Sequence, residues 1–377
     1  MPHGTPPTPP APARLPVTHP LPTVPLDDAV RTQYRLLECT AAHFEGPQLF
    51  AADTGVVPGL GRPRTTARVE AVLAQFLGAE DAALVQGAGT GAIRAALQAA
   101  DLAGAPLLIH RAPVYRTTAV TLRGLGADTV EVDFNDTAAL EAALAGGRFS
   151  WAYVQHSRQR LTDSYDPGAV LAACAAAGVR TVVDDNYAVL RAPACGVELG
   201  ADVSCFSLFK LHGPEGVGAV VGARDLVERV RADNYSGGGQ VQGHQALDAL
   251  RALTHVPLMW AVQSRVGSEV AERLAAGEVP GVADVRLANV QDRCLIVLLD
   301  RPVARDLPAV AARYGAAPYP VGSNSRYEIA PLFYRMSSSS LDDAPELADR
   351  AVRINPMRAG ADLVIEILRR SLHDLKG

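Results

Sequence analysis

The sequence predicts an α/β protein with a large, doubly wound, mostly parallel sheet and a small C-terminal α+β domain. Short apolar runs alternate with Ala/Leu-rich helical stretches from Val69 onward. The runs are continuously apolar, which is typical of parallel strands covered by helices on both faces. A chain of 377 residues also exceeds the size at which one hydrophobic core usually stops growing. We therefore expect more than one domain.

Seven apolar runs are predicted as strands of the large sheet, and helical spacing fills most of the gaps between them. The predicted strands are 82–86, 106–110, 129–133, 151–155, 180–184, 203–206 and 217–222. The helical segments between them include 92–99, 137–145 and 168–177. This order predicts repeated strand–helix–strand units.

The pattern of helices and strands after the last predicted strand of the large sheet indicates where the domains end. A helical stretch from about 240 to 275 leaves the large domain. The smaller domain contains a strand region, a helix, a strand and a closing helix, at 285–299, 303–314, 352–355 and 362–375. We divide the chain into an N-terminal arm, a large domain and a small domain, at 1–40, 41–275 and 276–377. The arm is rich in proline to about residue 25 and lacks the regions of a secretory signal, so we expect it to be disordered or loosely docked.

Composition and charge favour a protein that acts on small molecules. The formal net charge is -5 and there is no sustained basic run, which argues against nucleic acid or an anionic membrane surface as the main partner. No apolar stretch approaches the ~20 residues that span a bilayer. The five cysteines are dispersed without a CxxC pair, which indicates reduced thiols in a cytoplasmic protein and no metal site.

Ionisable side chains that could take part in catalysis follow two of the predicted strands. Asp184 and Asp185 end one strand, and Lys210 follows a later one. Ligands of such a sheet bind at the carboxyl ends of its strands. A lysine that forms a Schiff base and a carboxylate that keeps a pyridine nitrogen protonated are the parts of a pyridoxal 5'-phosphate (PLP) site. A strand-end lysine alone is ordinarily a solvated charge, so the interpretation depends on the neighbouring motifs.

The first predicted strand ends in a glycine-rich loop that begins at Gly87 and opens a helix. Its small residues allow backbone N–H groups to approach a phosphate at the positive end of that helix. A dinucleotide site is the alternative, but it needs an acidic residue at the end of the next strand, where His110 and Arg111 stand instead. Ser207 could reach the same phosphate, and the Tyr115 ring could cover a pyridine.

Together these motifs resemble the fold-type I PLP-dependent enzymes. The similarity is strongest to the cystathionine lyase/synthase (Cys/Met metabolism) group and the class V aminotransferase superfamily, and closer still to a set of uncharacterised bacterial PLP-dependent proteins. It extends from about residue 48 to the C-terminus. The motifs that carry it are 87–92, 115–118, 183–187, 199–202, 207–210, 214–222, 235–240 and 352–354.

The resemblance implies a role for each matching position. It makes Lys210 the Schiff-base lysine, Asp184 the partner of the pyridine nitrogen with Asp185 as its rival, and Tyr115 the stacking tyrosine. Asn186 would lie near the ring or its 3-oxygen. The phosphate would be held by Gly87, Gly89, Thr90 and Ser207. Arg353 would bind the substrate α-carboxylate, since a guanidinium recognises a carboxylate through two parallel hydrogen bonds.

The sequence departs from the Cys/Met group at three points. Gly87 stands where that group has a serine. The tyrosine–arginine pair that the group lends to a neighbour's phosphate is absent before Pro63, and Arg62 or Arg64 is the possible substitute. The asparagine that contacts the ring oxygen in many relatives is replaced by the segment that contains His156 and Arg158.

The implied chemistry starts with an amino acid that displaces Lys210 from the cofactor, after which the freed amine removes the Cα proton. Tyr115, in a Tyr-x-x-Thr context, favours elimination or replacement. A class V-like aminotransferase uses the same residues, as does a racemase. A non-catalytic PLP-binding protein would have no need for Arg353. We expect a homodimer that completes the site, with the glycine-rich loop 235–240 reaching the neighbour.

Overall fold

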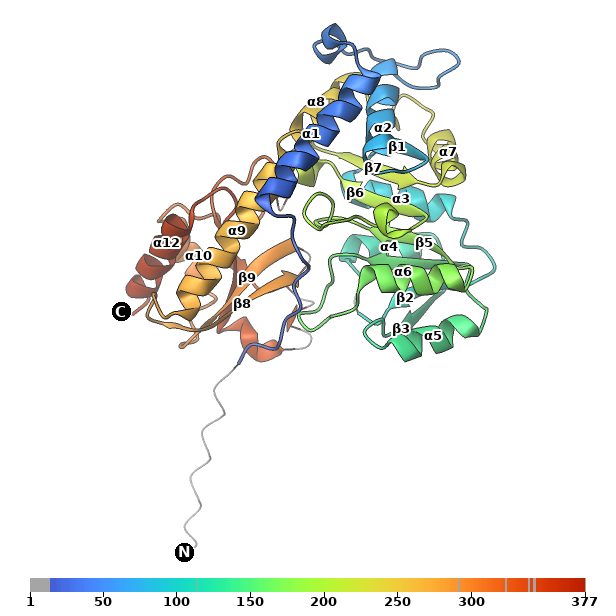
Figure 1. The fold of residues 1–377 in the computed structure, drawn as a ribbon. Helices are drawn as coiled ribbons and strands as arrows, with labels where there is room; N and C mark the ends of the chain where they lie inside the picture. Colours follow the sequence, from blue (N-terminus) through green and yellow to red (C-terminus); the bar gives the residue numbers. More distant parts are fainter. Residues whose placement is uncertain are drawn as a thin grey trace, which may run out of the picture.

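The computed structural model describes residues 14–376 apart from 113, 291, 323, 338, 339, 342 and 343. It divides into a large part with a seven-stranded sheet and a smaller part with a four-stranded sheet, joined by the long helix α9 (Val256–Ala275) (Figure 1). The predicted α/β fold class is confirmed.

The large sheet has the strand order β1-β7-β6-β5-β4-β2-β3, and only β7 runs antiparallel to its neighbours. Its strands are β1 (Asp81–Gln86), β2 (Leu107–His110), β3 (Thr129–Val132), β4 (Trp151–Gln155), β5 (Arg180–Asp184), β6 (Val203–Ser207) and β7 (Val217–Gly222). All seven predicted strands are present, with limits that differ by at most one residue.

Helices cover both faces of this sheet, as continuously apolar strands require. The helices packed on one face are α3 (Ala88–Ala99), α4 (Arg116–Gly124) and α7 (Arg224–Asp233). Those on the other face are α2 (Arg64–Phe76), α5 (Thr137–Ala145), α6 (Pro167–Ala176) and α8 (Gly243–Leu253). The carboxyl ends of the parallel strands stay open between the two layers.

The small sheet is antiparallel, in the order β10-β11-β9-β8. Its strands are β8 (Val282–Val290), β9 (Asp292–Leu299), β10 (Leu332–Arg335) and β11 (Ala351–Asn355). Helices α10 (Leu307–Ala312) and α12 (Ala361–Asp374) pack with the end of α9 on one face. The predicted strand region 285–299 is therefore a hairpin of two strands, and β10 is an addition to the prediction.

The predicted helical stretch 240–275 is two helices rather than one. α8 ends at Leu253 and α9 begins at Val256. Pro257 lies in the first turn of α9, where its missing N–H and fixed φ are tolerated, whereas inside one continuous helix it would remove a hydrogen bond. Because α9 buries Trp260 in the large core and Leu274 in the small core, we propose to keep the domain boundary at 275/276.

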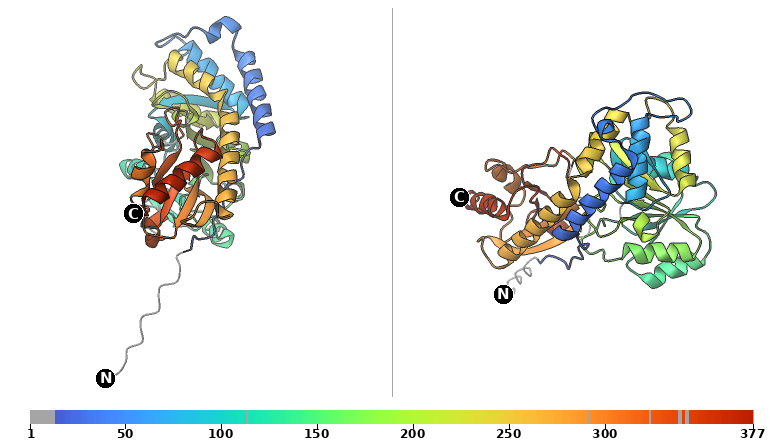
Figure 2. Two further views of the ribbon diagram at one scale, coloured as in Figure 1. Left: turned by 90° about the vertical axis from the view of Figure 1, so that its left-hand side faces the viewer. Right: turned by 45° about the horizontal axis from the view of Figure 1, so that its top comes forward.

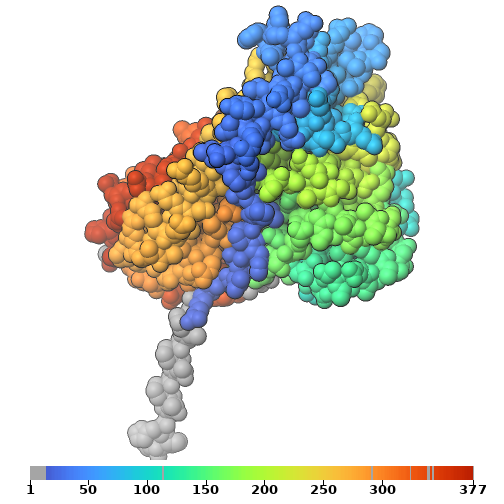
Figure 3. Space-filling model, in the orientation of Figure 1, coloured from blue at the N-terminus to red at the C-terminus, as the bar shows by residue number. Residues whose placement is uncertain are grey.

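The segment expected as an N-terminal arm contains a helix, α1 (Leu26–His43), which lies beside α9 in all ribbon views (Figures 1 and 2). Ahead of it, residues 14–25 run along the boundary between the two domains (Figure 3). The Thr18 hydroxyl donates to the carbonyl of Leu287, and Arg293 donates to the carbonyl of Leu21. This stretch is docked by specific hydrogen bonds; residues 1–13 lie outside the described part of the chain.

Within the described part of the chain, no helix combines the length and the apolar character needed to cross a membrane. All five cysteines are buried as free thiols.

Candidate active site

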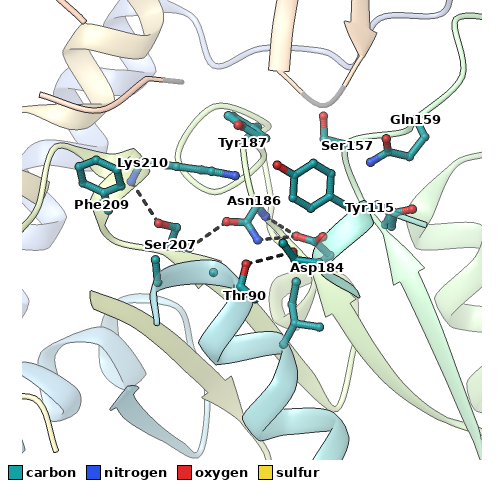
Figure 4. A pocket seen from close by; sticks show the side chains of 15 residues that line it. Thr90, Tyr115, Ser157, Gln159, Asp184, Asn186, Tyr187, Ser207, Phe209 and Lys210 are labelled. Atoms are coloured by element: carbon teal, nitrogen blue, oxygen red, sulfur yellow. Dashed lines mark hydrogen bonds between the residues drawn. The ribbon is translucent and has the colours of Figure 1, made fainter. Parts of the chain in front are cut away.

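A pocket of about 160 Å³ lies at the carboxyl ends of the central strands, beside the first turns of α3 and α4 (Figure 4). Three adjacent strands supply their last residues to it, namely Gln155 of β4, Asp184 of β5 and Ser207 of β6. The full lining is Ala88, Gly89, Thr90, Ile93, Tyr115, Thr117, Gln155, Ser157, Gln159, Asp184, Asn186, Tyr187, Ser207, Phe209 and Lys210. Topology alone brings these distant residues together, because parallel strands end at one edge.

Asp184 is the buried carboxylate of the pocket. One of its oxygens accepts hydrogen bonds from the backbone N–H and the side-chain amide of Asn186, at 3.0 and 2.7 Å. The other accepts from the Tyr153 hydroxyl at 2.9 Å. Burial raises the pKa of Asp184, and the Asn186 hydrogen bonds and the charge of Lys210 oppose that rise. The chain thus surrounds this carboxylate with donors that favour its ionised form.

Asp185, the rival of Asp184, is absent from the pocket lining. Its side chain is fully buried, accepts from the Gly196 N–H at 2.9 Å and pairs with the His156 ring at 2.7 Å. The structure therefore places Asp184 in the cavity and Asp185 in a buried pair behind it.

Lys210 lies in the short 3-10 helix Phe209–Leu211, where its backbone N–H donates to the Ser207 hydroxyl at 3.2 Å. Its amine lies 3.8 Å from the centre of the Tyr187 ring. Burial lowers the pKa of Lys210, while the carboxylates of Asp184 and Asp292 and the phenol of Tyr115 act in the opposite direction. A lowered pKa leaves a larger fraction of the amine neutral near pH 7, as a nucleophile or a general base requires.

The glycine loop fits an anion at the first turn of α3. Gly87 has φ 96 and caps the helix, and its N–H and that of Ala88 donate to the Gly216 carbonyl. The N–H groups of Gly89 and Thr90 come next, in the turn that lacks carbonyl partners within the helix. A Cβ at Gly89 would lie 2.3 Å from the Asn186 side-chain oxygen, so a larger residue would have to displace the amide that is hydrogen-bonded to Asp184. Gly87 itself shapes the turn and does not line the pocket.

Tyr115 precedes the first residue of α4 and remains 40% exposed at the mouth of the pocket. Thr117, in the first turn of α4, shares a 3.0 Å hydrogen bond with the Thr90 hydroxyl. The α4 start that carries Tyr115 is thereby tied to the start of α3.

The predicted alternatives for the ring oxygen, His156 and Arg158, both point elsewhere. His156 pairs with Asp185, and Arg158 donates to the Tyr165 carbonyl at 2.7 Å and to the carbonyl of His19. The pocket is lined instead by the alternate residues Gln155, Ser157 and Gln159, which the sequence analysis did not select. Their spacing of two, which continues the strand period, is the signal that could have found them.

Thr117, Tyr187 and Phe209 also line the pocket and were not predicted as site residues. Tyr187 and Phe209 flank Lys210 in the pocket (Figure 4). Each stands within three residues of a selected residue in the sequence, so proximity to Tyr115, Asp184 and Lys210 was the available signal.

Arg353 lies on β11 of the small domain and does not line the pocket. Its guanidinium stacks 4.1 Å from the centre of the Tyr334 ring, and its Nε donates to the Arg335 carbonyl at 2.9 Å. Burial acts to lower the pKa of Arg353, but the surroundings, among them Tyr334 and the carboxylate of Asp292, raise it overall. Because Asp292 acts on Lys210 as well, Arg353 belongs to the charged surroundings of the pocket although it is outside its wall.

The two arginines considered as phosphate partners differ in their environment. The Arg62 guanidinium lies 2.6 Å from the buried carboxylate of Glu70 and also donates to the carbonyl of Leu60. Arg64, at the first position of α2, is exposed. Arg62 is committed within its own chain.

Family models match two stretches in the middle and C-terminal parts of the chain. Residues 268–368 match the YhfS-like C-terminal domain, and residues 163–259 match the class-V aminotransferase family. Over 356 residues the chain is 48% identical to the protein YhfS of Escherichia coli K12, covering 94% of this chain and 99% of that protein. A shorter stretch of 81 residues is 36% identical to a cysteine desulfurase of Frankia sp., covering 22% of this chain and 19% of the desulfurase.

Solved structures show the same relationship. The crystal structure of the pyridoxal-5'-phosphate dependent protein YhfS from Escherichia coli superposes with a TM-score of 0.93 at 47% identity, covering 95% of this chain and 99% of that one. A cystathionine gamma synthase from Xanthomonas oryzae pv. oryzae gives a TM-score of 0.69 at 18% identity, over 92% of this chain and 98% of its own. The second comparison shows the fold alone.

Proposed function

The chain belongs to the YhfS family of fold-type I, PLP-dependent proteins, and from that premise we propose that it is an enzyme acting on the Cα–H bond of an amino acid. The observation that carries the proposal is that Lys210, Asp184 and Tyr115 line one pocket. A buried amine with a lowered pKa and a carboxylate held by three hydrogen-bond donors are the two groups this chemistry needs.

The residues present fit the cofactor at both of its ends. Gly89 opens a cradle that a Cβ would fill, next to the first-turn N–H groups of α3, and Thr90 and Ser207 add hydroxyls for a phosphate. At the other end Asp184 would face the pyridine nitrogen. The Asn186 amide is used to bridge Asp184 and the Ser207 N–H, so it would brace the ring's surroundings.

When bound, the cofactor supplies an electron sink for a carbanion at Cα. The chain supplies the rest. Lys210 would take the proton from Cα onto Nζ as general base. Asp184 would hold a proton on the pyridine nitrogen, and Tyr115 would cover one face of the ring and limit water access from the open side.

Arg353 would bind the α-carboxylate of the substrate. Its position on β11 and the stacking on Tyr334 hold the guanidinium, and among the residues that the structure describes only its Nε has a hydrogen-bond acceptor. The remaining N–H groups are available for a two-point contact with a carboxylate. Because Arg353 lies outside the pocket wall, the substrate would have to be oriented with its α-carboxylate toward the small domain.

Elimination or replacement at Cβ or Cγ is the reaction we favour, from the Tyr-x-x-Thr context of Tyr115. The match of residues 163–259 to the class-V aminotransferase family supports a transaminase as the second candidate. A non-catalytic PLP-binding protein is the third, and the position of Arg353 beside Asp292, whose charge also acts on Lys210, argues against it. We further propose a cytoplasmic homodimer, since the five thiols are unbridged and the pocket is open at the sheet edge.

A product assay separates the candidates. The holoenzyme is incubated with each amino acid, and ammonia and keto acid are measured with and without an added keto-acid acceptor. Elimination releases ammonia together with a keto acid and needs no acceptor, whereas transamination depends on the acceptor and releases no ammonia. Absence of both products, and of exchange of the Cα proton with solvent, would contradict an enzymatic role.

A further inference from the structure

We propose that Tyr187 is the positioning residue for the free amine of Lys210, holding it on the face of its ring and favouring its ammonium form. The inference rests on the proposed function, because it concerns the steps in which the amine is not bonded to the cofactor. The direct observation is the 3.8 Å separation between the Lys210 amine and the Tyr187 ring centre (Figure 4). A cation over an aromatic face is attracted by the ring quadrupole, and the attraction is stronger where water is excluded.

The backbone at Tyr187 gives a second, independent observation. Its φ is 70, in the left-handed region that favours glycine or asparagine and is uncommon for a bulky aromatic residue. Such positions persist where the surroundings hold them, and they gather at functional sites. The turn is fixed from behind, because the N–H groups of Ala188 and Val189 both donate to the Asp185 carbonyl. The strained turn directs the ring toward the pocket that Lys210 shares.

The charges around Lys210 explain why an uncharged aromatic ring is a suitable partner for its ammonium group. The charged and titratable groups that act on Lys210 come from three elements, β5, the α4 cap and β9, and are Asp184, Tyr115 and Asp292. Asp184 is needed by the cofactor ring, so a direct ion pair with the amine would compete with that role. A ring face stabilises the ammonium without supplying a full negative charge.

For the reaction, this arrangement concerns the transfer of the Cα proton to the Lys210 amine. The Cα–H bond breaks, an N–H bond forms on the Lys210 nitrogen, and the electron pair stays with the substrate and cofactor. The new ammonium would then rest on Tyr187 until it returns the proton. Tyr187 would thus raise the basicity of Lys210, against the effect of burial.

The chain allows an unusually direct test, because Lys210 and Lys376 are its only lysines. Full-length, cofactor-free protein labelled with ¹³C at the lysine ε-carbon should give two side-chain signals, and Lys376 serves as the internal reference. The pH titration of the Lys210 signal is compared in the parent, Tyr187→Phe, Tyr187→Trp and Tyr187→Leu. Tyr187→Phe and Tyr187→Trp keep the ring face, and Tyr187→Leu removes it.

We expect Tyr187→Leu to weaken protonation of Lys210 by about two- to thirty-fold, with the other two variants close to the parent. An unchanged titration in Tyr187→Leu, or an equal loss in Tyr187→Phe, would overturn the inference, the latter because it would assign the effect to the hydroxyl. Because the readout uses cofactor-free protein, it is independent of whether the parent binds PLP. A failure of the proposed function and a failure of this inference are therefore distinguishable.

Discussion

The hydroxyl of Tyr153 donates a 2.9 Å hydrogen bond to the carboxylate of Asp184, and both side chains are buried. Tyr153 lies in the middle of β4 and Asp184 ends β5, so the sheet fixes the contact. Burial first, and then the charge of Asp184, raise the pKa of Tyr153 well above its usual value, so the phenol stays protonated as a donor. The hydrogen bond in turn favours the ionised form of Asp184.

Tyr153→Phe should therefore raise the pKa of Asp184 further, because burial remains and one donor is lost. The acid limb of the pH–rate profile should move to higher pH by about one to two pH units, since a hydrogen bond to a charged group contributes about 1.5–3 kcal/mol. The pH–rate profile and the pH titration of cofactor absorbance measure this. Thr118→Val is the control, because Thr118 contacts the same phenol only at 3.4 Å. Superimposable profiles for Tyr153→Phe and the parent would contradict the coupling.

Lys210→Ala should abolish the visible absorbance of the bound cofactor, and Lys376→Arg should leave it unchanged. Only these two side chains offer a primary amine in this chain, apart from its N-terminus. Borohydride reduction of the parent followed by peptide mass spectrometry should place the cofactor mass on the peptide that contains Lys210. Labelling of Lys376, or persistent colour in Lys210→Ala after reduction and dialysis, would show that the lysine is misassigned.

The choice between the adjacent aspartates gives another prediction. Asp184→Asn should keep cofactor binding and lose most turnover, because it removes the charge opposite the ring and leaves the phosphate cradle intact. Asp185→Asn should instead lower stability, because Asp185 is fully buried against His156 and the Gly196 N–H. Thermal midpoints and rates of both variants test the difference. Turnover lost in Asp185→Asn alone, at unchanged stability, would reverse the assignment.

The limits of the large-sheet strands could be predicted from the sequence to within one residue, and Asp184 and Lys210 could be selected as site residues. The strands are continuous apolar runs that end in polar residues, and parallel topology brings those ends to one edge, which is why Asp184 and Lys210 could be chosen together. Ser157 and Gln159 lie beyond Gln155, the last residue of β4, so the only signal for them in the sequence was the strand period of two continued past the end of the strand. The position of Arg353 outside the pocket depends on how the small domain packs against the large one. Strand β10, Leu332–Arg335, was not predicted because it is only four residues long. Such features depend on long-range contacts.

Arg353→Lys should lower kcat/KM by roughly one to two orders of magnitude, because lysine keeps the charge and loses the planar fork. The cofactor spectrum should not change. Arg335→Lys is a matched control from the neighbouring strand, since Arg335 is exposed and, within the described part of the chain, its side chain has a single 3.4 Å hydrogen bond, to the Arg305 carbonyl. A substrate amide without the carboxylate should react equally poorly with parent and variant. Full activity of Arg353→Lys on amino acids would move the anchor to another arginine, such as Arg358.

The buried amine of Lys210 should also make the cofactor-free protein pH-sensitive. Burial lowers its pKa in the folded state, so between that pKa and about 10.4 the unfolded state binds more protons and stability rises with pH. Below the folded-state pKa the cost of burying the ammonium is present in full. Lys210→Met should therefore raise the thermal midpoint at neutral pH, with a gain that shrinks toward pH 10, whereas Lys376→Met should not. A pH-independent difference would show that packing, and not charge, is responsible.

The phosphate end of the pocket should be completed by Arg64 of a second subunit. Lys210 is the only lysine or arginine that lines the pocket as described, and a phosphate carries more charge than one helix end offsets. Arg62 is held by Glu70, whereas Arg64 is exposed at the start of α2. Arg64→Ala should therefore weaken cofactor retention, measured as cofactor per chain after dialysis. The dimer itself is checked by light scattering.

A mixed dimer of Lys210→Ala and Arg64→Ala chains separates the two possible origins of the arginine. If Arg64 acts across the interface, the site with an intact Lys210 receives Arg64 from its Lys210→Ala neighbour, and one of the two sites holds cofactor as tightly as the parent. If Arg64 acts within its own chain, each site carries one defect and neither site retains the cofactor. Retention near half of the parental value supports the shared site, while retention near zero in a verified mixed dimer would contradict it.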